Sequence, residues 1–177
     1  RSLPHILKSR PNAKILIIGG DKVSYGIKPK NNESWKNIFL NEIRSQLTEE
    51  EFARIFYLGN IKYSDFITII QLSSVHVYLT YPFILSWSLL EAMSVGCSVV
   101  ASNTKPLHEV ITQNENGRLI NFFDFHQLSK EICYLLDNPK ERLRLGENAR
   151  KFVKSNYDLK SICLPNQLKW VDSLLEM

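Results

Sequence analysis

The stretch SWSLLEAMSVGCSVVAS, residues 86–102, decides the fold because it joins a helix pattern to a strand pattern through a single glycine. Its first part places apolar side chains at three- and four-residue spacing, which is typical of an amphipathic helix. The run CSVVAS after Gly96 is nearly continuous in apolar residues, as in a strand buried on both faces. The sequence therefore predicts a helix that stops at Gly96 and turns into a strand.

Outward from this stretch, the same two patterns alternate along the chain. Strand patterns occur at KILIIGG (14–20), ARIFYLG (53–59), VHVYLT (75–80) and GRLINFF (117–123). Helix patterns separate them at 35–47 and 64–74. Strands that alternate with helices of this length predict right-handed crossovers between parallel strands. We therefore expect an α/β fold with a doubly wound, mostly parallel, Rossmann-like sheet.

The last part of the chain has helix patterns only. Asp124 with Gln127 has the spacing of a capping box, and Asn138 followed by Pro139 and Glu141 marks a second helix start. This helical tail is expected to follow the sheet rather than to contribute strands to it.

The domain organisation expected is one α/β domain over residues 1–156, followed by a C-terminal helix over 157–177. The 177 residues, 44% of them hydrophobic, are enough for one sizeable core. Because the chain starts at Arg1 inside an amphipathic pattern, we expect it to be a fragment of a longer polypeptide.

The net charge and the cysteine positions indicate which ligands and which cellular compartment suit the protein. The 22 Lys and Arg against 18 Asp and Glu give a net charge of +4, spread too evenly to indicate nucleic acid. This charge suits an ordinary solvated surface, an anionic small molecule or loose contact with an anionic membrane surface. Cys97, Cys133 and Cys163 lie in apolar runs, as expected of reduced core thiols in the cytoplasm. No spacing of Cys and His residues suggests a metal.

Glu91 is the one acidic residue of residues 86–102, and helix periodicity defines its surroundings. The arc expected to face the sheet holds Leu89, Leu90, Ala92, Met93 and Gly96. The opposite arc holds Trp87, Ser88, Glu91 and Val95. A solvated surface charge is one interpretation of Glu91. The other follows from position, because Glu91 comes one to two turns after a strand's carboxyl end, where open α/β sheets bind ligands.

A ligand at that edge has a definite chemistry. The N-terminus of a helix presents N–H groups and a positive dipole end, which suit phosphate oxygens. A carboxylate such as Glu91 one or two turns further on accepts two hydrogen bonds from a sugar diol. Together these groups would suit the ribose and phosphates of a nucleotide.

Two segments, residues 73–111 and 116–158, resemble the C-terminal domain of retaining, metal-independent glycosyltransferases of the GT-B fold, family 4 (group 1). The most specific piece is LLEAMSVGCSVVAS (89–102), which matches the family's helix-glycine-strand signature, and the similarity runs from Pro4 to Tyr157. The resemblance implies that this chain is the half of an enzyme that binds a nucleotide-sugar donor. A missing N-terminal domain would bind the acceptor.

The resemblance assigns Glu91 to the donor ribose, as the second acidic residue of an E-x7-E motif. The first acidic position falls on Phe83 or, in another alignment, on Tyr81, so its carboxylate is lost. Backbone N–H groups of residues 84–86 would stabilise the leaving diphosphate. Phe83 and Trp87 either contact the sugar or acceptor, or pack at a domain interface. The expected diphosphate and sugar loop is Phe83, Ile84, Leu85, Ser86 and Ser88.

Upstream residues complete the expected donor site. By resemblance, the nucleobase contacts are Gly59, Asn60 and Ile61. The weaker diphosphate candidates are Gly19, Gly20 and Lys22, with Lys28 and Lys30 in the same loop. The alternative for the three lysines is a solvated loop. His108 is either a sugar or phosphate contact or a structural histidine, and Glu109 is expected on a helix surface.

The function expected is transfer of a sugar, with a UDP-sugar favoured over a GDP-sugar, to a saccharide or lipid-linked acceptor. Neither a cofactor nor a metal is expected, and the fragment alone should transfer no sugar. The resemblance implies polysaccharide biosynthesis in the cytoplasm, with peripheral association of the full-length protein at the inner membrane face. Two alternatives remain: a non-catalytic scaffold module, and a UDP-sugar epimerase, for which we find no paired carboxylates.

Overall fold

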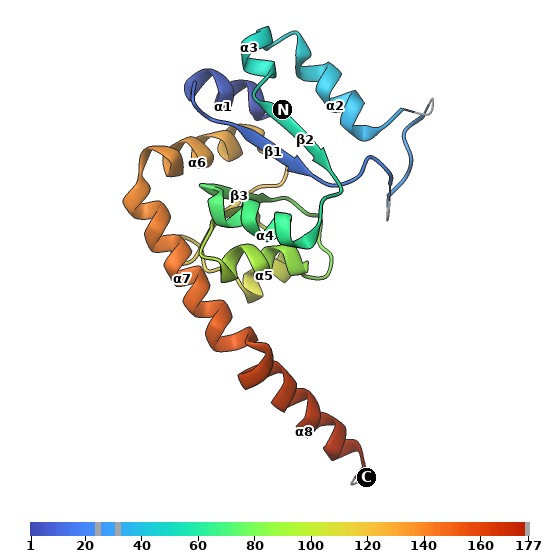
Figure 1. Cartoon of the computed structure of the whole chain (residues 1–177), viewed down its shortest axis with the longest axis vertical. Helices are drawn as coiled ribbons and strands as arrows, with labels where there is room; N and C mark the ends of the chain where they lie inside the picture. The colour runs from blue at the N-terminus through green and yellow to red at the C-terminus, as the bar shows by residue number, and fades with distance from the viewer. Residues whose placement is uncertain (24–25, 31–32, 176–177) are drawn as a thin grey trace. The chain divides into compact units, whose positions relative to one another are not determined.

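The computed structural model describes residues 1–23, 26–30 and 33–175, and it has an α/β fold with parallel strands (Figure 1). The chain forms two compact units. The first unit comprises Arg1–Phe66 and Asp124–Tyr134, and the second comprises Ile67–Phe123 and Leu135–Met177. The chain passes from one unit to the other inside helix α4 (Tyr63–Leu72), just before helix α6 (Phe125–Asp137) and again inside α6.

The first unit is built on strands β1 (Ile15–Ile18) and β2 (Ile55–Gly59), which pair in parallel with Ile15 opposite Ile55. Its other helices are α1 (Leu3–Ser9), α2 (Trp35–Arg44) and the single turn α3 (Glu49–Phe52). The core of the unit consists of Leu7, Ile43 and Leu47, against which Ile15 and Ile55 pack. One face of the two strands is therefore covered by the apolar sides of α1 and α2.

Arg54 holds the first unit together at the start of β2. Its guanidinium donates hydrogen bonds to the carbonyl oxygens of Leu7 (2.8 Å), Arg10 (2.9 Å) and Ala13 (3.2 Å). The last carbonyls of a helix have no partner within the helix. Arg54 thus satisfies acceptors at the end of α1 and in the turn that leads to β1.

The second unit contains a three-stranded parallel sheet in the order β3 (Val75–Tyr78), β4 (Ser98–Ser102) and β5 (Arg118–Ile120). The central strand β4 is buried along its whole length. Its helical elements are α5 (Trp87–Ser94), the 3₁₀ turn η2 (Lys105–Glu109) and α7 (Pro139–Tyr157). A π-helical turn η3 (Leu159–Cys163) joins α7 to α8 (Leu164–Leu175), which continues away from the sheet of this unit (Figure 1).

Two glycines let α7 pack closely on the end of α5. Gly96 ends α5 in the left-handed region, with φ of +80°. A Cβ added to Gly146 of α7 would lie 2.1 Å from the carbonyl oxygen of Gly96. Arg150 of α7 also donates a hydrogen bond to the carbonyl oxygen of Ser94 (2.6 Å). The backbone of α7 can therefore approach this turn only where it carries no side chain.

The predicted α/β fold is confirmed, and each of the five predicted strands is present but shorter than its apolar run. The predicted helices at 35–47, 64–74 and 86–96 correspond to α2, α4 and α5. Among the described residues, strand hydrogen bonds form two parallel groups, β1–β2 and β3–β4–β5. The short element α3 was not predicted, and η2 was expected only as the helix surface that carries Glu109, because one turn is too short to show a helical period.

Three local predictions have different outcomes. Asp124 caps α6, accepting a hydrogen bond from the Gln127 N–H (2.8 Å). Asn138 does not cap the described first turn of α7 with its side chain, because its backbone (φ −118°, ψ 74°) is not in the extended conformation of a usual N-cap. Val95, expected to face outward, packs against the core, because α7 lies on α5 in addition to the sheet.

Candidate functional site

The carboxyl ends of β1 and β2 form a cavity in the first unit. Gly19 (φ +138°) and Gly59 (φ +63°) both adopt backbone conformations that disfavour other residues, and the Gly19 N–H donates to the Gly59 carbonyl oxygen (2.9 Å). The cavity has a volume of about 330 Å³ and is lined by Gly19, Gly20, Asp21, Lys36, Tyr57, Leu58 and Gly59. A volume of this size lies in the range of small-molecule sites.

Most of the upstream candidates lie at this edge. A Cβ added to Gly20 would lie 3.3 Å from the side-chain amide of Asn60, so Asn60 lies directly against the glycine pair. Ile61 follows Asn60 and is half-buried. In the described part of the chain, the exposed Lys22, Lys28 and Lys30 do not line the cavity. Positions 24, 25, 31 and 32 of the predicted loop 19–34 lie outside the described residues.

Lys36 is the cation that the sequence analysis missed. It forms an ion pair with Asp21, and its ammonium lies 5.2 Å from the ring centroid of Tyr57. Burial raises the pKa of the Tyr57 phenol, an effect that Lys36 opposes and Asp21 reinforces. Ser34 accepts a hydrogen bond from the Asn37 N–H (3.1 Å), which fixes the helical turn that carries Lys36. The available signal was a lysine in the first turn of the helix that follows the glycine loop.

In the second unit, hydrogen bonds join the segments that follow β3, β4 and β5. The Thr80 N–H donates to Ser102 Oγ (3.0 Å), which donates in turn to the Thr80 carbonyl oxygen (2.8 Å). The Asn103 N–H donates to the Ile120 carbonyl oxygen (2.6 Å). His108 Nε2 lies 2.5 Å from Asn103 Oδ1, so this exposed histidine is held at the same edge. Glu109, the last residue of η2, is exposed as expected.

The loop before α5 carries the predicted donor residues. Ser86 is the N-cap of α5 and accepts a hydrogen bond from the Ser88 N–H (3.3 Å), and the two hydroxyl oxygens are 2.9 Å apart. Phe83 and Ile84 are exposed, whereas Leu85 packs against the core. The start of α5 is therefore fixed by its cap and one apolar anchor, and the chain before it is open to solvent.

Glu91 lies in the second turn of α5 and is half-buried. Leu89, Ala92 and Met93 are fully buried, so the helix is oriented as its periodicity predicted. The rise of about 1.5 Å per residue places Glu91 roughly 7 Å along the axis from Ser86. This spacing would suit a carboxylate that contacts the sugar of a ligand whose phosphates lie at the helix start.

An aromatic cluster that sequence analysis did not predict lies at the same edge. It consists of Tyr81 after β3 and of Phe122 and Phe123 after β5. The ring centroids of Tyr81 and Phe122 are 4.4 Å apart, and those of Phe122 and Phe123 are 5.0 Å apart in an edge-to-face arrangement. The cluster therefore joins the segment after β3 to the segment after β5, the two outer strands of this sheet.

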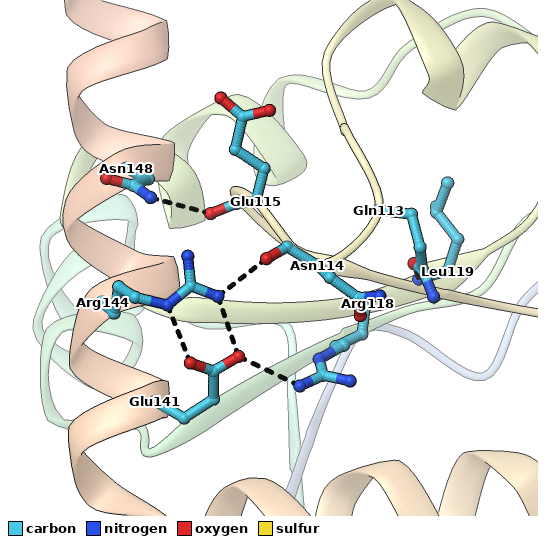
Figure 2. Close-up of polar contacts among 8 residues, drawn as sticks. All are labelled: Gln113, Asn114, Glu115, Arg118, Leu119, Glu141, Arg144 and Asn148. Carbon is cyan, nitrogen blue, oxygen red and sulfur yellow. Dashed lines mark hydrogen bonds and ion pairs between the residues drawn. The ribbon is translucent and has the colours of Figure 1, made fainter.

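A second cavity, of about 450 Å³, lies at the other end of the same sheet. It is lined by Asp137, Asn138, Pro139, Lys140, Glu141 and Arg144. Figure 2 shows Glu141 between Arg118 (3.0 Å) and Arg144 (2.8 Å), while Arg144 also donates to the Asn114 carbonyl oxygen (2.7 Å). Because Arg118 is the first residue of β5, this cavity is at the amino ends of the strands, away from the edge at which α/β sheets bind ligands.

The described residues show neither a metal-binding group nor a membrane-spanning helix. Residues 1–23, 26–30 and 33–175 contain no group of three or more His, Cys, Asp or Glu side chains placed to hold a metal ion. Across the same residues, no helix combines the length and apolar character that a bilayer crossing requires.

Comparison with known proteins identifies the family. The profile of the family described as "Glycosyl transferases group 1" matches residues 1–152. An uncharacterised glycosyltransferase from Methanocaldococcus jannaschii is 32% identical over 107 residues, which is 60% of this chain and 27% of that protein. The chain thus corresponds to about a quarter of the length of this curated relative.

Solved structures show the same fold. The C-terminal domain of the group 1 glycosyltransferase LpcC from Francisella tularensis superposes with a TM-score of 0.76 at 19% identity, covering 90% of this chain and 77% of that one. HepE from Anabaena, in complex with UDP-glucose, superposes with a TM-score of 0.75 at 17% identity, covering 99% of this chain and 44% of that one. These structural likenesses establish the fold, and the profile match establishes the family. The chain therefore belongs to the group 1 glycosyltransferases.

Proposed function

We propose that this chain is the donor-binding, C-terminal domain of a family 4 glycosyltransferase that moves a sugar from a UDP- or GDP-sugar to a saccharide or lipid-linked acceptor. The observation that carries the proposal is the family match over residues 1–152, which contains the signature 89–102 on α5 and β4. HepE, which has the same fold, was solved in complex with UDP-glucose, and this supports a UDP-sugar as the first donor to test.

Each proposed role follows from local chemistry. Glu91 accepts hydrogen bonds from the donor ribose, and the backbone of residues 84–86 with Ser86 and Ser88 receives the diphosphate. Gly59, Asn60 and Ile61 contact the base, beside the cavity that holds Gly19, Gly20 and Lys36. Lys36 replaces Lys22 as the basic group that we favour for the diphosphate, because it lines this cavity.

The proposed reaction needs stabilisation of negative charge on the departing diphosphate. Backbone N–H groups and the positive end of the α5 dipole supply it without a metal ion, in a retaining reaction. The acceptor would be bound by an N-terminal domain, so the chain alone transfers no sugar. Domain limits at 1–156 and 157–177, cytoplasmic location at a membrane face and a part in polysaccharide synthesis belong to the same proposal.

The test is calorimetric titration of the chain with UDP, GDP and ADP, repeated with Glu91→Gln. We expect one nucleotide to bind preferentially, and Glu91→Gln to weaken it by about 1.5–3 kcal/mol, as for a lost hydrogen bond to a charged group. Glu147→Gln is the matched control, because Glu147 is an exposed carboxylate on α7. Unchanged affinity in Glu91→Gln would contradict the ribose assignment, and binding of no nucleotide would favour the scaffold alternative.

A further inference from the structure

The aromatic cluster of Tyr81, Phe122 and Phe123 is exposed in spite of its size. Tyr81 is 60% exposed and Phe123 is 70% exposed, whereas Phe122 is half-buried beneath them. Exposed apolar side chains that gather in one contiguous patch often mark a ligand-binding or interaction site. Phe83 and Trp87 extend the exposed apolar surface along the loop that leads into α5.

The cluster is held in place before any ligand arrives. Phe122 supports the ring of Tyr81 at a centroid distance of 4.4 Å. The Phe123 N–H donates to Asn121 Oδ1 (2.9 Å), which fixes the turn after β5. The Thr80 hydroxyl donates to the Tyr81 carbonyl oxygen (2.9 Å), which fixes the turn after β3. A ligand that contacts these rings therefore has little ordering cost to overcome.

The segment that contains Tyr81 favours an uncharged group with one apolar face beside the cluster. Residues 79–90, LTYPFILSWSLL, contain no ionisable acid or base other than the Tyr81 phenol. A carboxylate or ammonium group of a ligand would find no ion-pair partner among the side chains of this segment. The diphosphate that the proposed function assigns to the start of α5 would contact backbone N–H groups instead. A pyranose ring presents C–H groups on one face and hydroxyl groups at its rim. Aromatic faces match the C–H face of the pyranose, and the Tyr81 hydroxyl can form a hydrogen bond with one of its hydroxyl groups.

We propose that the aromatic cluster is a stacking surface for the sugar ring of the nucleotide-sugar donor, an inference that rests on the proposed function. The sugar is bonded to the diphosphate, which the proposed function assigns to the start of α5. Tyr81 precedes Ser86 by five residues in the segment between β3 and α5, so we expect the ring attached to that diphosphate to lie near the cluster. The contact supplies apolar area and one hydroxyl group where the resemblance expects a carboxylate.

The experiment separates binding of the sugar from binding of the nucleotide. The chain is titrated with UDP and UDP-glucose, and with GDP and GDP-mannose. The sugar increment is the Kd of the nucleotide divided by the Kd of its sugar derivative. We expect an increment of about threefold to tenfold, the size of one good aromatic contact, for one of the two pairs. In Phe123→Ala and Tyr81→Ala it should fall to about one, with the nucleotide Kd unchanged.

Matched variants exclude a merely structural effect. Tyr81→Phe keeps the ring and should retain most of the increment. Trp170→Ala removes a 65% exposed aromatic ring on α8, outside the cluster, and should leave the increment unchanged. Circular dichroism and the unfolding temperature establish that each variant folds.

The other outcomes contradict either the stacking surface or the donor function. An increment of one in the unmodified chain, or an increment that survives Phe123→Ala and Tyr81→Ala together, overturns the stacking surface and leaves the donor function standing. Failure of the unmodified chain to bind any nucleotide overturns the donor function, and the stacking surface with it.

Discussion

Single residues set the closest contacts in this chain, and Gly146 is the clearest case. A methyl group on Gly146 would lie 2.1 Å from the carbonyl oxygen of Gly96 and 3.0 Å from its carbonyl carbon. Backbone atoms cannot move aside as the end of a flexible side chain can. We therefore expect Gly146→Ala to destabilise the chain by about 1–3 kcal/mol, as overpacking usually does, although alanine is the better helix former.

Chemical denaturation measures this difference. Gly26→Ala is the matched control, because among the described residues its added Cβ would meet Val23 Cγ1 alone, at an ordinary 3.5 Å. If Gly146→Ala instead stabilises the chain, as the helix propensity of alanine predicts, then α7 does not pack as closely on the turn after α5 as described.

At the same scale, periodicity predicted that Leu89, Ala92 and Met93 of α5 are buried, because neighbours along one helix face follow from 100° per residue. It did not predict Lys36, because nothing local shows that α2 returns to the end of β1. The cysteines illustrate the same limit: Cys97 and Cys133 are buried as expected, and burial raises the pKa of the Cys97 thiol to about 11, whereas Cys163 is half-buried.

At the scale of elements, one side chain joins helix α1 to strand β2. Arg54 donates to the carbonyl oxygens of Leu7, in the last turn of α1, and of Arg10 and Ala13, in the turn between α1 and β1. We expect Arg54→Met, which keeps the apolar stem, to lower the free energy of unfolding by about 1.5–3 kcal/mol.

Urea denaturation followed by circular dichroism tests this expectation. Lys14→Met is the control at an exposed position just before β1. It removes a positive charge but leaves the hydrogen bonds of Arg54 intact, so it should change the free energy of unfolding little. Equal stability of the two variants would show that water replaces Arg54 at the end of α1.

The longer an element repeats its hydrophobic pattern, the better the sequence predicted it. The strands and the helices α2, α4 and α5 repeat their pattern often enough to be recognised, whereas α3 and η2 end within about one turn. The aromatic cluster escaped prediction for another reason. Tyr81 and Phe122 are far apart in sequence and meet only because β4 lies between β3 and β5.

At the scale of the whole molecule, the sequence predicted the fold class but not the pairing of the strands. Alternating patterns indicate which segments are strands, and the crossover rule makes them parallel. The division into the β1–β2 and β3–β4–β5 groups depends on hydrogen bonds between distant segments, which no local pattern contains.

Acid sensitivity is the prediction that concerns the whole molecule. Side-chain hydrogen bonds, from Arg1 to Glu42, from Arg144 to Glu141 and from Ser161 to Asp158, lower the pKa of these three carboxyl groups. The unfolded chain then binds more protons than the folded chain between the lowered pKa and the ordinary one. Stability from these groups is therefore complete above the ordinary pKa of Glu, 4.5, and is lost as the pH falls through the lowered values.

Glu141 allows this sign to be tested directly, because its contacts with Arg118 and Arg144 are partly shielded from water (Figure 2). We expect Glu141→Gln to be less stable than the unmodified chain by about 1–3 kcal/mol at pH 7. The gap should narrow as the pH falls through the lowered pKa of Glu141, because the native carboxyl group then becomes protonated as well. Urea midpoints measured between pH 7 and pH 3 give the curve, with Glu147→Gln as the exposed control on the same helix. A gap that stays constant over this range would mean that Glu141 acts through its shape and not through its charge.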